Sequence, residues 1–184
     1  MSKRIALLSA VAFSALALTS TFVAPARAEE KTVMVGGAAM FPSRNIIQNA
    51  VNSKDHTTLV AAVKAAGLVD TLEGKGPFTV FAPTNAAFGK LPEGTVDSLV
   101  KPENKATLTR ILTYHVVPGK LEASDLSDGR KLKTVEGEEL VVKRANGKVM
   151  IVDAKGGTAS VTISNVNQSN GVIHVVDSVL MPAS

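Results

Sequence analysis

The chain changes character near its middle, and this change constrains the fold more than any other feature. The first part carries apolar residues at helical spacing, as in Leu59, Val60, Val63 and Ala66. The second part carries short β-rich runs separated by polar residues and glycines. These runs lie at residues 140–143, 149–152, 161–163 and 172–176. Helices that cluster early and strands that cluster late predict an α+β domain, with helices on one side of a largely antiparallel sheet.

Local signals set the ends of several predicted helices. Asn45 or Ser43 can cap a helix that begins near residue 46, and Gly67 can end the next helix in a left-handed conformation. Pro102 suits the first turn of a later helix, which carries its apolar residues on one face. His56 lies between the first two helices and is expected at the surface.

The predicted strands also have clear limits. Residues 78–82 form an apolar run that Pro83 stops, and residues 114–117 form a second run that Pro118 and Gly119 end. Asn146-Gly147 can supply the two positive φ angles of a tight hairpin. His174 lies in the most apolar of the later runs, so we expect it to be hydrogen-bonded near the core.

Three blocks of sequence follow one another in a distinctive order. The first reads Thr-Val-Phe-Ala-Pro-Thr-Asn-Ala-Ala-Phe over residues 79–88, the second is Tyr114-His115, and the third reads Asn-Gly-Val-Ile-His-Val-Val-Asp over residues 170–177. Their order and spacing resemble the two signature segments of a fasciclin domain and the Tyr-His pair between them. The resemblance extends from about residue 45 to residue 182. It implies a wedge-shaped β-sandwich of about seven strands, with several helices packed on one side.

The resemblance also implies candidate binding residues. The Tyr-His pair of animal fasciclin domains is associated with adhesion to cell-surface receptors, which points to Tyr114 and His115 here. Some animal relatives carry an adhesive Asp-Ile pair shortly before the last block, and Asn165-Val166 occupies the matching positions. The charge of that pair is absent from this chain. A scaffold role for Tyr114-His115 is the alternative, and the sequence favours it, because Val116 and Val117 follow in a strand-like run.

The N-terminus has the layout of a cleaved secretory signal peptide. Lys3 and Arg4 precede an apolar run over residues 5–18, and Ala-Arg-Ala follows at 26–28. We expect residues 1–28 to be the signal peptide, 29–44 an extended leader that can pack on the domain, and 45–184 the fasciclin domain. The apolar run is shorter than the ~20 residues of a spanning helix, so we expect no permanent membrane anchor. A bacterial periplasm fits best, and full secretion is the alternative.

Charge and cysteine content restrict the function further. Three of the 20 basic residues precede the expected cleavage point, which leaves 17 basic against 16 acidic residues in the mature chain. Neither a strong basic field nor a dense basic block remains, so nucleic-acid binding is not predicted. The chain has no cysteine, which removes thiol catalysis and thiolate metal sites.

No familiar catalytic or cofactor motif is present. The serines lack a Gly-x-Ser-x-Gly elbow, and the glycines lack phosphate-loop or dinucleotide spacing. His56, His115 and His174 are far apart in sequence and form no helical pair of metal ligands. We therefore expect no enzyme activity, no metal and no cofactor.

Three functions are ranked on this basis. The first is a non-enzymatic adhesion or interaction module, whose partner is a cell-surface or matrix protein or a polysaccharide at the cell envelope. The second is a periplasmic protein that binds a small ligand or lipid in a cleft between helices and sheet. A hydrolase is the third. The sequence leaves the partner and the oligomeric state open.

Overall fold

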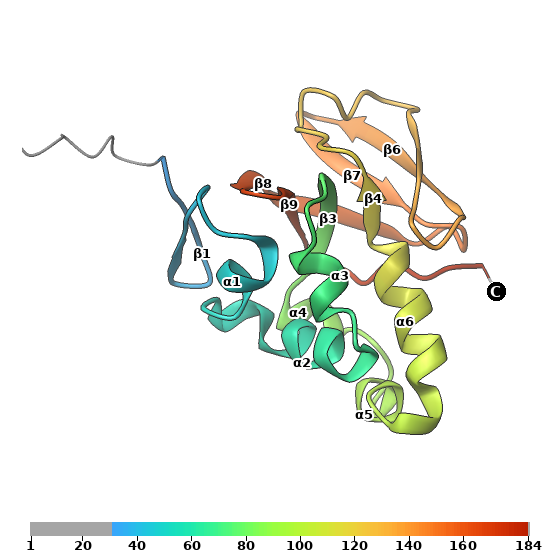
Figure 1. The fold of residues 1–184 in the computed structure, drawn as a ribbon. Helices are drawn as coiled ribbons and strands as arrows, with labels where there is room; N and C mark the ends of the chain where they lie inside the picture. Colours follow the sequence, from blue (N-terminus) through green and yellow to red (C-terminus); the bar gives the residue numbers. More distant parts are fainter. Residues whose placement is uncertain (1–30, 184) are drawn as a thin grey trace, which may run out of the picture.

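The computed structural model describes residues 31–183 and places a layer of helices against a strongly curved sheet (Figure 1). The helices are α1 (Ile46–Ala50), the 3-10 turn η1 (Lys54–His56), α2 (Thr57–Ala66), α3 (Val69–Glu73), α4 (Asn85–Gly89), α5 (Thr95–Leu99), the 3-10 turn η2 (Pro102–Asn104) and α6 (Lys105–Tyr114). The strands are β1 (Val33–Val35), β2 (Ala38–Met40), β3 (Phe78–Pro83), β4 (Val116–Pro118), β5 (Lys131–Lys133), β6 (Glu139–Ala145), β7 (Lys148–Val152), β8 (Thr158–Gln168) and β9 (Gly171–Val176).

Seven strands form one sheet in the order β4-β3-β9-β8-β7-β6-β5. Only β3 and β9 are parallel, and every other neighbouring pair is antiparallel. The long strand β8 pairs with β7 through residues 158–160 and with β9 through residues 161–168, with register shifts between. Such irregularities increase the bend and twist of a strand. The bend lets β8 pair with β7 on one side of the sheet and with β9 on the other. The Val135 N–H donates to the Val116 carbonyl at 2.8 Å, so the two edges nearly close into a barrel. The predicted α+β class with a largely antiparallel sheet is confirmed.

Local signals account for the ends of the helices. Asn45 and Gln48 form a reciprocal capping box at the start of α1, with distances of 2.8 and 3.1 Å between side-chain oxygen and backbone nitrogen. Thr84 caps α4 in the same sense, since its hydroxyl accepts from the Ala87 N–H at 3.2 Å. Gly67 ends α2 at φ 72°, as predicted. The same holds for the hairpin between β6 and β7, where Asn146 has φ 52° and Gly147 has φ 75°.

Two predictions were wrong in position. Tyr114 is the last residue of α6 and His115 is its C-cap, so neither begins a strand; β4 starts only at Val116. The apolar pattern of α6 runs directly into that of β4, which hides the boundary. His56, expected at the surface, is 3% exposed. The 3-10 turn that holds it points its ring inward.

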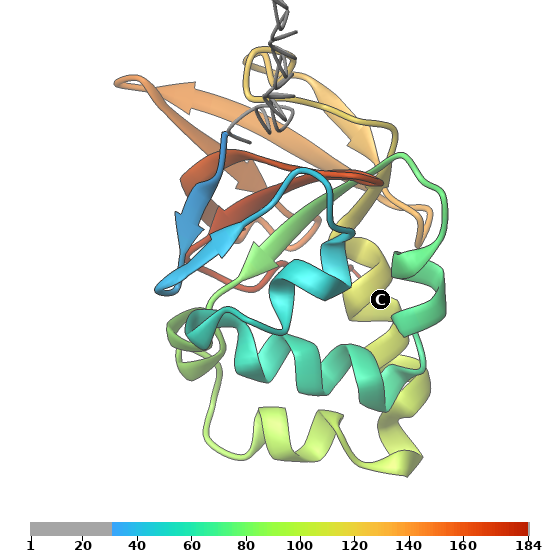
Figure 2. The same ribbon diagram turned by 60° about the vertical axis from the view of Figure 1, so that its left-hand side comes forward.

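Residues 33–40, within the segment predicted as an extended leader, form the antiparallel hairpin β1–β2. Val35 and Met40 of this hairpin are buried in the same core as the helices. Figure 2 shows the hairpin beside β8. The strands have three residues each, which is too short for a visible alternation in the sequence.

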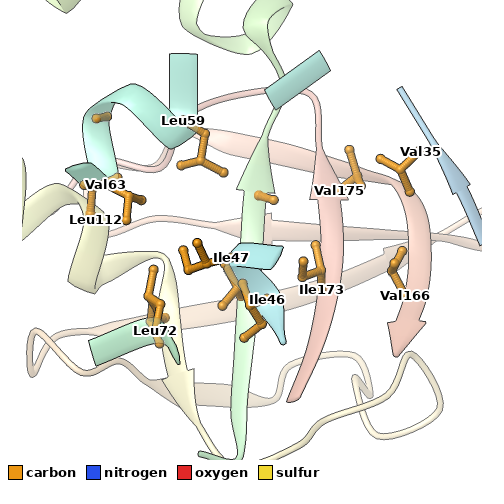
Figure 3. Close-up of a cluster of buried hydrophobic side chains, with 14 of the residues drawn as sticks. Val35, Ile46, Ile47, Leu59, Val63, Leu72, Leu112, Val166, Ile173 and Val175 are labelled. Carbon is orange, nitrogen blue, oxygen red and sulfur yellow. The ribbon is translucent and has the colours of Figure 1, made fainter. Parts of the chain in front are cut away.

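Two apolar cores hold the domain together. The helix-side core lies between α1, α2, α3, α6 and one face of β3 and β9, and includes the side chains labelled in Figure 3. The sheet-side core fills the interior of the curved sheet. Its members are Phe81, Tyr114, Val117, Leu126, Leu132, Leu140, Val142, Val149, Ile151, Ala159, Val176 and Leu180.

Candidate functional site

Tyr114 lies in the sheet-side core with no exposed surface. Its hydroxyl accepts from the Ala154 N–H at 2.8 Å and donates to the Glu139 carbonyl at 3.4 Å. These contacts join the end of α6 to β6 and to the turn after β7. Burial raises the pKa of Tyr114, so the hydroxyl keeps its proton. The ring and the hydroxyl are both engaged within the fold.

His115 is 2% exposed and bonded at both ring nitrogens. Nδ1 is 2.8 Å from the Ile111 carbonyl, which can only accept, and Nε2 is 3.0 Å from the backbone nitrogen of Leu180, which can only donate. This pattern requires the neutral ring with its proton on Nδ1. Burial lowers the pKa of His115 to about 4, although the Ile111 carbonyl and Asp153 act in the opposite direction. His115 thus ties helix α6 to the C-terminal segment.

Asn165 and Val166 occupy the irregular part of β8. Asn165 has φ 57°, and its side-chain oxygen accepts from the Ala123 N–H at 2.7 Å. Asparagine tolerates this left-handed conformation better than most residues. Val166 is 1% exposed and belongs to the helix-side core. The structure brings His115 and Val166 to the wall of one cavity, whereas Tyr114 and Asn165 lie elsewhere.

His174 is fully buried in β9, and the prediction of a hydrogen-bonded core histidine is confirmed. Its Nε2 donates to the Leu121 carbonyl at 2.8 Å, and its Nδ1 accepts from the Asn165 N–H at 3.4 Å. The ring stacks on Phe81, with centroids 5.7 Å apart and planes at 26°. Burial lowers the pKa of His174, so the ring is neutral near pH 7.

Asn170 has a structural role that the sequence analysis missed. Its side-chain oxygen accepts from the Ile46 N–H at 3.1 Å, and its amide nitrogen donates to the carbonyls of Leu72 at 2.7 Å and Gly74 at 2.9 Å. Its carbonyl also accepts from the Phe78 N–H at 3.0 Å. One buried side chain therefore fixes the start of α1 and the end of α3 beside the sheet. In the sequence, Asn170 stands out only as the first residue of the third block.

The C-terminal segment is held by side chains from three separate parts of the chain. His115 binds the Leu180 N–H, as described above. The carboxylate of Asp153 accepts from the Met181 N–H at 3.0 Å, and that of Glu138 accepts from the Ala183 N–H at 2.8 Å. These contacts close one end of the sheet-side core, because Leu180 is 1% exposed.

A small apolar cavity of about 40 Å³ lies within the helix-side core. His56 borders it, with Nδ1 2.9 Å from the Ser53 hydroxyl and with no hydrogen bond at Nε2. Burial lowers the pKa of His56, while the nearby Ala82 carbonyl and Asp55 oppose that effect. A cavity of this size admits a few water molecules at most and is far too small for a lipid.

A larger groove of about 620 Å³ opens beside the β1–β2 hairpin. Its lining mixes aliphatic, amide, hydroxyl and charged side chains. The lining residues are Lys31, Val33, Met40, Pro42, Glu122, Ser164, Asn165 and Asn167. The side-chain oxygen of Asn167 is buried here without a hydrogen-bond partner.

The chemistry of a triad or a metal centre is not assembled by the residues described. Ser53 and His56 are in contact, but both are almost fully buried and no carboxylate bonds to Nε2 of His56. Within residues 31–183, no three His, Asp or Glu side chains converge as metal ligands would. In the same range, no helix has the length and apolarity needed to cross a bilayer.

Comparison with known proteins identifies the family. The fasciclin domain model matches residues 54–182, and the chain belongs to this family. In the solved structure of a FAS1 domain pair from the insect cell adhesion molecule Fasciclin I, the fold is the same, with a TM-score of 0.69 at 19% identity. That similarity covers 77% of this chain and 52% of the insect chain, so the chain spans about half of the domain pair.

Bacterial relatives are closer in sequence. Protein sll1483 of Synechocystis sp. is 45% identical over 179 residues, covering 97% of this chain and 96% of its own. Immunogenic protein MPB70 of Mycobacterium bovis is 36% identical, covering 94% of this chain and 89% of its own. Cell surface glycolipoprotein MPB83 of the same species is 39% identical, covering 80% of this chain and 64% of its own.

Proposed function

We propose that the mature chain is an exported, non-enzymatic interaction module that binds a protein or polysaccharide at the cell envelope. Family membership supports this, because MPB83 is named for the cell surface and Fasciclin I for cell adhesion. The sequence of residues 1–28 supports export to the periplasm or beyond, although this segment lies outside the described residues.

The observation that carries the proposal is that side chains suited to acid-base chemistry are hydrogen-bonded within the fold. Both ring nitrogens of His115 and of His174 make such bonds, and so does the hydroxyl of Tyr114. All three side chains are buried, so a substrate at the surface could not contact them. In this proposal Tyr114 and His115 are scaffold, and recognition uses the outer faces of the domain.

A pull-down from envelope extract tests the proposal. The mature domain is the bait, and the matched control is a heat-unfolded sample of the same protein that has been coupled to the same resin. We expect the folded domain to retain a protein or polysaccharide that the control does not. Hydrolysis of general ester, phosphate or glycoside substrates by the purified domain would contradict the non-enzymatic part.

The groove beside the β1–β2 hairpin favours a second candidate, the binding of a small polar ligand. Its volume is in the usual range for ligand sites, and its lining combines opposite charges with amide and hydroxyl groups. Screening a metabolite mixture for increases in melting temperature tests this candidate. A ligand of the groove should lose its effect in Asn165→Gly, which removes the side chain and suits the positive φ.

A further inference from the structure

The outward face of strands β5, β6 and β7 carries a row of lysines that the strand register creates. On these strands Leu132, Leu140, Val142, Val149 and Ile151 point into the sheet-side core. The residues between them therefore point outward, since side chains alternate along a strand. Four lysines, Lys131, Lys133, Lys143 and Lys148, have this orientation, and all four are exposed.

The register places three of these lysines, Lys131, Lys143 and Lys148, on one diagonal line. Lys131 lies opposite Val141, two residues before Lys143, and Lys143 lies opposite Met150, two residues after Lys148. Successive members are thus diagonal neighbours, and Lys133 extends the line along β5. Diagonal neighbours on one sheet face are roughly 7–8 Å apart. We name this line, Lys133-Lys131-Lys143-Lys148, the lysine row.

The rest of the face is arranged in strips parallel to the row. Val141 and Met150 lie next to the lysines, together with Val152, and all three are half-buried. Beyond them on β8, Thr158 lies opposite Val152 and Ser160 lies opposite Met150. The face therefore presents cations, then aliphatic surface, then hydroxyl groups, on a rigid sheet.

Acidic groups do little to cancel the charge of the row. Glu139 shares the face, lies directly opposite Lys133 and contacts the Nζ of Lys131 at 3.3 Å. The side chains of Glu139 and Lys131 are both more than half exposed, which makes such a pair weak. Glu136 and Glu138, in the loop before β6, are within 4.0 Å of the guanidinium of Arg110. Asp128 binds the backbone N–H of Arg144 at 2.7 Å.

We propose that this face binds an acidic polysaccharide. Carboxylates that repeat along a sugar chain match the lysine row, the apolar faces of the rings match the aliphatic strip, and sugar hydroxyls match Thr158 and Ser160. A membrane surface fits less well, because the three aliphatic side chains are half-buried and do not protrude to insert among lipids. Nucleic acid fits less well, because these outward positions include no aromatic side chain for bases to stack on.

This inference rests on the proposed function and specifies the class of partner, an acidic polysaccharide. The experiment uses the mature domain and polygalacturonate as the probe, with neutral dextran and phosphatidylglycerol vesicles as comparisons. Variant one replaces Lys131, Lys133, Lys143 and Lys148 with Gln. The control variant replaces Lys64, Lys75, Lys101 and Lys105, four exposed lysines near or on the helices, with Gln and so has the same net charge. Melting curves establish that both variants are folded.

We expect the wild-type domain to bind polygalacturonate and the lysine-row variant to bind it about tenfold more weakly or worse, judged from four weak surface ion pairs acting together. The control variant should stay within about twofold of wild type, a difference small on the same scale. Added NaCl should weaken binding by the wild type more than by the lysine-row variant. Replacing the four lysines with Arg should preserve binding, and Glu139→Gln should strengthen it.

Other results would overturn the inference. Equal loss in both Gln variants would show a response to net charge alone. Binding to the vesicles and not to polygalacturonate would replace the polysaccharide with a membrane. If no sample binds polygalacturonate, the inference fails. The proposed function would survive each of these results if the lysine-row variant still captures its envelope partner in the pull-down, so the two failures are distinguishable.

Discussion

Two buried polar side chains, one beside each core of the domain, differ in how fully they are hydrogen-bonded. In the helix-side core, His56 borders a cavity of about 40 Å³ and leaves Nε2 without a hydrogen bond. In the sheet-side core, Tyr114 is fully buried and its hydroxyl makes two hydrogen bonds. The hydroxyl of Tyr114 therefore helps to join the segments that enclose the sheet-side core, whereas the helix-side core contains an unfilled cavity beside His56. Substitutions in the two cores should therefore differ in cost.

The largest expected effect is that of Tyr114→Ala. Removing a fully buried aromatic side chain leaves a cavity and should lower the free energy of unfolding by about 3–5 kcal/mol. Urea denaturation followed by circular dichroism measures this. Tyr114→Phe is the control and should cost about 1 kcal/mol, since it removes only the hydroxyl bonds. A small loss of unfolding free energy in Tyr114→Ala would mean that the sheet-side core can relax to fill the cavity. The proposed difference between the two cores would then be wrong.

Acid should destabilise the domain through His115. The unfolded ring binds a proton near pH 6.5, whereas the folded ring does so only near pH 4. Between these values the unfolded state binds more protons, so stability is full above pH 6.5 and falls as the pH drops toward 4. One pH unit is worth about 1.4 kcal/mol, so the loss from His115 is on the order of 3 kcal/mol. His56 and His174 act in the same direction.

Denaturation midpoints across pH 4–7 check this prediction in wild type and in His115→Gln. The variant should be less stable at pH 7, because it loses the fit of a neutral ring between Ile111 and Leu180. Its stability should also fall less between pH 6.5 and 4. Parallel curves for the two proteins would assign the acid sensitivity to other groups.

A matched pair of histidine substitutions sharpens the comparison between buried polar groups. His174→Leu loses the bond to the Leu121 carbonyl and the stacking on Phe81, which should cost about 1–3 kcal/mol. His56→Leu loses the contact with Ser53 and the attraction of the Ala82 carbonyl, but it borders a cavity that can accommodate the new side chain, so its cost should be about 1 kcal/mol or less. Thermal melts at pH 7.5, where both rings are neutral, measure the difference. Equal losses of stability in the two variants would show that His56 contributes as much as His174, although its Nε2 has no hydrogen bond.

The hairpin Asn146-Gly147 gives a small predicted effect. Gly147→Val places a β-branched residue at φ 75° and should cost about 1–2 kcal/mol. A Cβ atom at this position meets no other atom within 4 Å, so the loss would report backbone strain alone. Gly147→Asn is the control and should cost less, because asparagine tolerates positive φ. An unchanged denaturation midpoint in Gly147→Val would show that this hairpin turn does not contribute to the stability of the domain.

The sequence predicted features that depend on neighbours along the chain. Asn45 and Gly67 act at helix ends through bonds or angles that span only a few residues. Asn146-Gly147 determines its own turn geometry in the same way. The family resemblance added the overall fold, which local patterns alone could not specify.

Features that join distant segments were missed for a physical reason. The parallel pairing of Phe78 with Gly171 joins residues far apart in sequence, and the bonds of Asn170 to Ile46 and Leu72 do the same. The burial of His56 depends on strand β3 and helix α6, neither of which is adjacent to it in sequence. Likewise, the lysine row exists only once the register of β5, β6 and β7 is known.

The position of β9 has a consequence for the order in which the domain can form. This strand lies between β3 and β8 near the middle of the sheet, yet it is the last strand along residues 31–183. Until β9 emerges from the ribosome, β3 can pair only with the short strand β4, and the turn that carries Asn170 is missing. Contacts of such long sequence separation form late and slowly. A growing chain therefore lacks a central strand of its sheet, and the turn that anchors α1 and α3, until its synthesis is nearly complete.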